Sequence, residues 1–143
     1  KEVVARLKDG GMIVSAFIDA ETKQVEASKT AGFDVCEVHT GPYASAFAKA
    51  GGDFLVKPLA DELASVRDAG ALIRRLGMRF NAGHALTYHN VKPIASLEGA
   101  TELHIGHAIV SRAVFTGLRE AVREMKRLMV EAASHKTQIL PDK

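Results

Sequence analysis

The chain has 143 residues, of which 47% are hydrophobic and 25% charged, and its formal net charge is +2. This is the composition of a globular protein with a core of its own, and its charges are mixed along the chain, so we expect no nucleic acid partner. No apolar stretch reaches the roughly 18 residues of a membrane-spanning helix, and the start does not resemble a secretion signal. We therefore expect a cytoplasmic protein that does not contact a membrane.

The first residues are typical of a helix that stops at the Gly10-Gly11 pair. Because the chain opens on lysine rather than methionine, we expect it to begin inside a larger protein. Residues 12–18 are apolar at both odd and even positions, which predicts a strand covered on both faces in a parallel sheet. Asp19 is then predicted to cap a helix that runs to about Ala31.

Residues 33–40 predict a second strand, in which Cys36, the single cysteine, is expected to be a buried thiol. Residues 41–58 contain a Gly-Gly pair and many small residues, and they predict a long connection. Such a connection is either a lid or binding loop, or an insertion on the surface or at a subunit contact. Apolar residues at helical spacing over 59–76 predict a long helix.

Residues 78–82 and 102–105 predict the third and fourth strands. Asn90 is a suitable N-cap for a short helix between them that ends before Gly99. Apolar residues at helical spacing predict one last helix over 109–133.

Strands and helices therefore alternate four times, which predicts a parallel sheet with right-handed crossovers. Four such units are half of a (β/α)₈ barrel, which needs about 250 residues. We expect residues 1–143 to be the C-terminal half of one barrel domain, and a smaller open sheet is the alternative. Residues 135–143 are expected to be a polar tail. A half barrel alone would expose two sheet edges and its apolar interior, which favours self-association.

Two Gly-His pairs, Gly83-His84 and Gly106-His107, are the most informative feature of the sequence. Each is predicted to end a strand and to open directly into a helix, where free backbone N–H groups bind phosphate and barrels carry catalytic groups. We expect the two junctions to form one shared pocket. A histidine there is suited to proton transfer near neutral pH.

The histidines do not have the spacing of a metal site. His104 and His107 are three residues apart, so on a strand they would point to opposite faces, and no pair has the helical spacing of zinc ligands. We therefore expect no metal. His39 and His89 are expected to lie at the rim or to pack.

Several motifs along the chain resemble the pyridoxine 5′-phosphate synthase family. They are Ser15-Ala16-Phe17-Ile18-Asp19, Glu37-Val38-His39-Thr40-Gly41, Asn81-Ala82-Gly83-His84, Tyr88-His89-Asn90-Val91-Lys92, Ile105-Gly106-His107-Ala108-Ile109, Arg112-Ala113-Val114 and Glu120-Ala121-Val122-Arg123-Glu124-Met125-Lys126. The resemblance implies a (β/α)₈ barrel that assembles into octamers and uses no cofactor. It also implies the condensation of 1-deoxy-D-xylulose 5-phosphate with 3-amino-2-oxopropyl phosphate to pyridoxine 5′-phosphate, phosphate and water.

The resemblance also assigns roles. His84 would be the proton donor, and Glu37 would stabilise cationic or iminium-like states; a structural ion pair inside the barrel is the alternative for this carboxylate, which is costly to bury unpaired. Gly106, His107 and Ala85 would bind the phosphate of the aminoketone. The family commonly has glycine in place of Ala85, so alanine would be strained if its φ is positive.

A further catalytic histidine, a further glutamate and most contacts to the deoxyxylulose phosphate would come from the first half of the barrel, so the chain alone is expected to be inactive. Two alternatives remain. One is another metal-free, phosphate-binding barrel isomerase or lyase that uses His84 with Glu37. The other is a non-catalytic assembly subunit.

Overall fold

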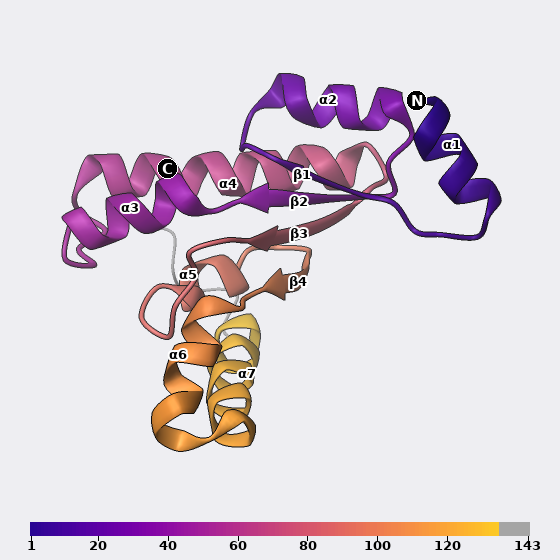
Figure 1. The fold of residues 1–143 in the computed structure, drawn as a ribbon. Helices are drawn as coiled ribbons and strands as arrows, with labels where there is room; N and C mark the ends of the chain where they lie inside the picture. Colours follow the sequence, from indigo (N-terminus) through magenta and orange to yellow (C-terminus); the bar gives the residue numbers. More distant parts are fainter. Residues whose placement is uncertain (135–143) are drawn as a thin grey trace.

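Four parallel strands form a single sheet in the order β1-β2-β3-β4 in the computed structural model, which describes residues 1–134 (Figure 1). The strands are β1 Ser15–Ile18, β2 Val35–His39, β3 Arg79–Gly83 and β4 Ala100–His104. All four predicted strands are confirmed, with boundaries shifted by up to three residues. The predicted tail at 135–143 lies outside the described residues.

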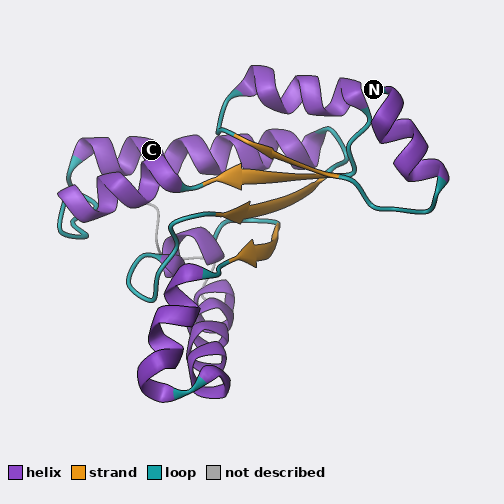
Figure 2. Ribbon diagram, viewed as in Figure 1, coloured by secondary structure: helices purple, strands orange, loops and turns teal. Residues whose placement is uncertain are grey.

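Helices connect the strands, as Figure 2 shows. They are α1 Glu2–Asp9, α2 Thr22–Ala31, α3 Gly41–Lys49, α4 Lys57–Arg75, α5 Val91–Ala95, α6 His107–Thr116 and α7 Leu118–Ser134. Consecutive parallel βα units are the repeating arrangement of a (β/α)₈ barrel, so the predicted α/β class is confirmed. Because the strands are parallel, their carboxyl ends lie at one edge of the sheet.

The start of α2 was predicted wrongly. The helix begins at Thr22 with Glu21 as its N-cap residue, and Asp19 lies before it. The Asp19 carboxylate instead accepts a hydrogen bond from the Gln24 side chain at 3.3 Å and lies 3.1 Å from Nδ1 of His39. Side-chain contacts with Gln24 of α2 and His39 of β2 therefore replace the expected cap.

The long connection predicted at 41–58 is also wrong, because it contains α3. This helix begins directly after β2, and Tyr43 in its first turn is completely buried. The Tyr43 hydroxyl donates a hydrogen bond of 2.8 Å to the carbonyl of Asn90. One buried aromatic residue thus anchors a helix whose other residues are mostly small.

The single last helix predicted over 109–133 is two helices. Gly117 has φ 81° and ψ 150°, a backbone conformation that residues with a side chain rarely adopt, and it ends α6 before α7 begins. The two helices fold back on each other as a hairpin that extends below the sheet in Figure 1.

The hydrophobic core lies between the sheet and the helices α2 and α4. Alternate strand residues point into it, among them Ile18, Val38 and Phe80, and Cys36 is buried there as predicted. A second cluster joins α7 to α5. The other face of the sheet carries Phe17, which is 57% exposed, and the polar side chains described below.

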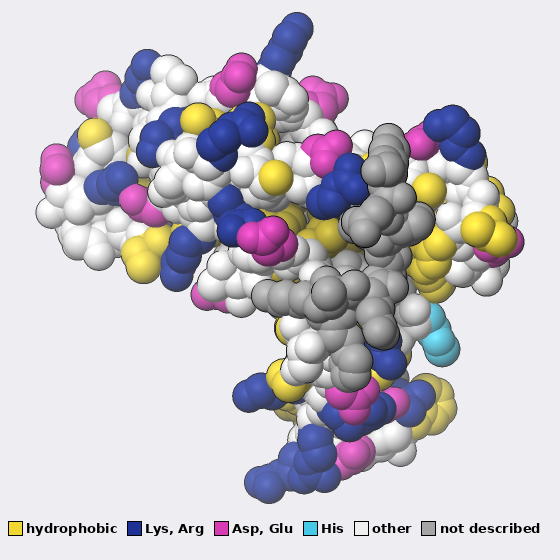
Figure 3. Space-filling model, turned by 180° about the vertical axis from the view of Figure 1, so that it is seen from behind, with side chains coloured by type: hydrophobic (Ala, Val, Ile, Leu, Met, Phe, Trp, Pro, Cys, Tyr) yellow, Lys and Arg dark blue, Asp and Glu magenta, His cyan; other side chains and the backbone are white. Residues whose placement is uncertain are grey.

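The two outer strands, β1 and β4, each pair with one strand within residues 1–134. In addition, α6 has no buried residue, and Val114 and Phe115 on it are exposed. The back of the molecule carries interspersed basic and acidic side chains (Figure 3), as the mixed charge pattern predicts. No helix in the described part of the chain combines the length and the apolar character needed to cross a bilayer.

Candidate active site

A pocket of about 570 Å³ lies at the carboxyl ends of β3 and β4. The lining includes every residue that the sequence singled out for the site. These are Glu37, His84, Ala85, Gly106 and His107. The prediction that the two Gly-His junctions share one pocket is therefore confirmed, while the roles of the individual residues stay predictions.

The first junction does not open directly into a helix, which corrects the prediction. After Gly83, residues His84 and Ala85 adopt left-handed conformations with φ of 78° and 58°. The side chain of Asn90 then closes a turn, since its Oδ1 accepts the N–H of Thr87 at 2.7 Å and its Nδ2 donates to the carbonyl of Ala85 at 3.2 Å. Left-handed backbone cannot start a right-handed helix, so α5 begins only at residue 91.

Ala85 has a positive φ. The backbone strain expected for alanine at this position is therefore present in the loop. Each non-glycine residue in this conformation costs about 1–2 kcal/mol. Thr40 at the end of β2 helps to hold the loop. Its buried hydroxyl lies 2.7 Å from the carbonyl of Gly83 and 2.6 Å from that of His84.

The second junction is as predicted, because only Ile105 separates β4 from Gly106, the N-cap residue, and His107 is the first residue of α6. The first N–H groups of a helix have no partner within the helix and carry partial positive charge. A Cβ added at Gly106 would meet no atom within 4 Å, so the space beside this helix start is open. An anion such as a phosphate group can bind there.

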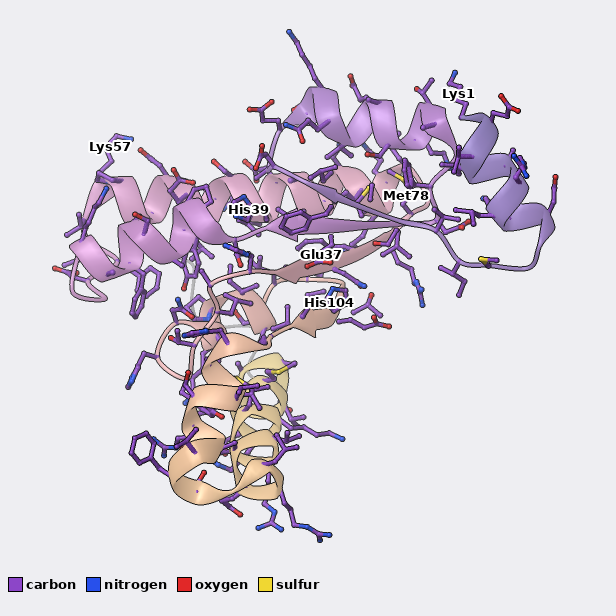
Figure 4. The ribbon with its side chains drawn as sticks, in the orientation of Figure 1. Lys1, Glu37, His39, Lys57, Met78 and His104 are labelled. Atoms are coloured by element: carbon purple, nitrogen blue, oxygen red, sulfur yellow. The ribbon has the colours of Figure 1, made fainter. Side chains whose placement is uncertain are left out.

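On the face of the sheet opposite the core, Glu37 and His104 point toward each other from β2 and β4, which are separated by β3 (Figure 4). Oε2 of Glu37 lies 2.6 Å from Nδ1 of His104. Nε2 of His104 lies 3.4 Å from Oε2 of Glu102, which also accepts a hydrogen bond of 3.2 Å from Nδ2 of Asn81. Glu37 therefore both lines the pocket and forms an ion pair with His104, while its role in stabilising positive charge stays a prediction.

The electrostatics of this cluster favour a charged imidazole. Partial burial by itself lowers the pKa of His104, but the hydrogen bonds to Glu37 and Glu102 and their negative charges outweigh it. The net effect raises the pKa of His104 above its ordinary value of 6.5. Both ring nitrogens can then donate to carboxylates.

A pair of histidines, His39 and His84, lies at the edge of the pocket. The rings of His39 and His84 are 4.8 Å apart in an edge-to-face arrangement, and Phe17 packs against both. The hydrogen bond from His39 lowers the pKa of Asp19 below its ordinary value. His39 is thus a packing residue, as predicted, but it packs against the proposed proton donor itself.

The contributions of Thr40 and Asn81 to the site were not predicted from the sequence, and His104 was considered there only as a metal ligand. The alternation of side chains along a strand could have indicated that His104 lies beside Glu102, since residues 102 and 104 of one strand share a face. Within residues 1–134, no group of three or more His, Cys, Asp or Glu side chains is placed to hold a metal ion.

Parallel βα units with acid–base side chains and an open helix start at the carboxyl edge define a protein of the (β/α)₈-barrel class. The chain belongs to the PdxJ family: the family profile described as "Pyridoxal phosphate biosynthesis protein PdxJ" matches residues 1–131. The resemblance seen in the sequence motifs is therefore confirmed, and so is the barrel fold class.

Three curated relatives carry the name pyridoxine 5′-phosphate synthase. The protein of Aromatoleum aromaticum is 66% identical over 133 residues, which are 93% of this chain and 53% of the relative. The protein of Dechloromonas aromatica is 62% identical over the same shares, and that of Azoarcus sp. is 60% identical over 94% of this chain and 54% of the relative. The chain thus spans about half the length of the curated relatives it matches.

Proposed function

We propose that this chain provides part of a pyridoxine 5′-phosphate synthase. The enzyme would condense 1-deoxy-D-xylulose 5-phosphate with 3-amino-2-oxopropyl phosphate by acid–base catalysis and release pyridoxine 5′-phosphate, phosphate and water. The observation that carries the proposal is the convergence of all five residues named by the resemblance on one pocket. The names of relatives that are 60–66% identical support it.

Each residue has a chemical task in this proposal. His84 donates a proton to the reacting molecule from the loop after β3, and Glu37 stabilises positive charge as the imine forms and rearranges. The N–H groups at the start of α6, beside Gly106 and His107, bind the phosphate of the aminoketone with the loop at Ala85.

We propose further that residues 1–143 form the C-terminal half of a single barrel domain. Even small closed barrels have about eight strands, and residues 1–134 contain four. The first half would then contribute a catalytic histidine, a glutamate and most contacts to the second substrate. By the same resemblance, the assembled protein would be a cytoplasmic homo-octamer whose ligands are small phosphorylated molecules.

The test is an assay of pyridoxine 5′-phosphate formation by the full-length protein that contains this chain, supplied with both substrates. His84→Ala should lower kcat by about 10²–10⁴-fold, the range of a lost general acid. His89→Ala is the matched control, because His89 is exposed and lies outside the pocket lining. Absence of product from the unmodified protein, or equal activity of both variants, would contradict the proposal.

A further inference from the structure

We propose that His104 is a positioning residue for Glu37, which it holds in the pocket and whose negative charge it partly neutralises when protonated. The inference rests on the proposed function, in which the Glu37 carboxylate stabilises positive charge. It adds a residue that the family motifs do not assign. Three features of the sheet carry it.

The first feature is the lack of a side chain at residue 83 of β3, the strand between β2 and β4. Neighbouring strands lie about 4.8 Å apart, so side chains on β2 and β4 are normally separated by a side chain of β3. Here Gly83 stands opposite His104 in the register. A Cβ at residue 83 would overlap Oε1 of Glu37 and would lie 3.1 Å from Cβ of His104. The missing side chain is therefore what allows the two groups to meet.

The second feature is the fixed orientation of the imidazole. Nδ1 faces Glu37 at 2.6 Å, slightly shorter than the roughly 2.7–2.9 Å of a charge-assisted N–H···O hydrogen bond, and Nε2 faces Glu102 at 3.4 Å. Asn81 in turn donates to Glu102. Because the ring is held from both sides, it restricts the Glu37 carboxylate to one position at the pocket wall.

The third feature is charge. The ionisable groups around the ring are Glu37 on β2 and Glu102 on β4, with His84 and His107 across the same pocket. When His104 is an imidazolium, it offsets the charge of Glu37; when it is neutral, Nδ1–H still holds the carboxylate, which then presents its full charge. Since its pKa is raised above the ordinary value of 6.5, kcat should increase as pH rises through that pKa and His104 loses its proton.

Two substitutions separate positioning from charge. In His104→Asn the amide Nδ2 takes the place of the imidazole Nδ1, so the carboxylate is still held but no group titrates. We expect kcat within about threefold of the unmodified enzyme at high pH and a weaker decline toward acid pH. In His104→Leu the donor is lost, and we expect kcat to fall about tenfold or more while the KM of both substrates changes less than about twofold.

The decisive measurement is a double-mutant cycle in the full-length protein. If His104 acts through Glu37, His104→Leu should cause little further loss of kcat in a Glu37→Gln background. Equal loss in both backgrounds would overturn the proposal, as would an unchanged kcat in His104→Leu. Circular dichroism of each variant establishes that it is folded.

An NMR titration of the His104 imidazole keeps this inference distinct from the proposed function, because it requires no turnover. Glu37→Gln should lower the pKa of His104, whereas Lys57→Gln, which changes an exposed pair with Asp61 on α4, should leave it unchanged. A protein that shows the shift but forms no pyridoxine 5′-phosphate would refute the proposed reaction and retain the pair. A protein that forms product without the shift would refute the pair alone.

Discussion

Replacing Thr40 by valine tests how the pocket loop is held. The Thr40 hydroxyl lies within hydrogen-bond distance of the carbonyls of Gly83 and His84, and its backbone N–H donates to Gly83 as well. Valine keeps the shape but removes the hydroxyl, so the carbonyl of His84 loses this donor while that of Gly83 keeps the N–H. A partly buried acceptor left unsatisfied costs about 1–3 kcal/mol, and we expect a loss of about 2 kcal/mol in the free energy of unfolding.

The catalytic effect should be larger than the effect on stability suggests. His84 is held at φ 78°, and without the hydroxyl its backbone can relax toward an unstrained conformation. A displacement of His84, the proposed proton donor, by about 1 Å can lower kcat by up to about a hundredfold. Denaturation by guanidinium chloride measures the change in the free energy of unfolding, and turnover by the full-length protein measures the change in kcat.

The matched control is Thr40→Ser, which keeps the hydroxyl and removes one buried methyl group. It should lose about 1 kcal/mol of stability through reduced apolar burial and yet retain kcat near that of the unmodified enzyme. If valine retained kcat and serine did not, the methyl contact rather than the hydrogen bonds would hold the loop, and the reasoning would be refuted.

Three further outcomes are expected. Gly70→Ala would place a Cβ 2.5 Å from Cε1 of Phe80; the overlap should exceed the gain in helix propensity of about 1 kcal/mol and destabilise the protein by about 1–3 kcal/mol in denaturant unfolding. Ala85→Gly should raise stability by no more than about 1 kcal/mol, because relief of the left-handed strain is partly offset by a more flexible unfolded chain; a loss above 1 kcal/mol would contradict this. The raised pKa of His104 adds stability below about pH 6.5 that is lost as pH rises through the folded-state pKa; since the side chain is 44% exposed, we expect under 1 kcal/mol, and Glu37→Gln should reduce it in unfolding curves at several pH values, because Glu102 remains beside the ring.

The architecture was predictable because it depends on local signals. Short apolar runs separated by helical segments determine the strands, and the alternation requires them to be parallel. The shared pocket followed from this, since parallel strands that end in Gly-His must bring those ends to one edge. The errors arose where one residue outweighed the average of its segment: Tyr43 anchors α3 within a stretch of small residues, and Gly117 interrupts an otherwise continuous helical pattern.

The contact between Glu37 and His104 could not be predicted in the same way. It depends on the register of β2 and β4 against the strand between them, and the irregularity between Phe80 and Asn81 shifts that register. Sequence alternation places both side chains on the same face but gives no relative height along the strands. A shift of pairing by two residues would keep the face and separate the two groups.

The absence of a side chain at residue 83 has a consequence for how this site could have arisen. Any larger residue there would occupy the space that Glu37 and His104 now share. A histidine acquired at position 104 could thus contact the carboxylate only in an ancestor that already had glycine at 83. Once that contact existed, any residue with a side chain at position 83 would have broken it. Gly83 can therefore no longer be replaced unless the contact between Glu37 and His104 is given up first.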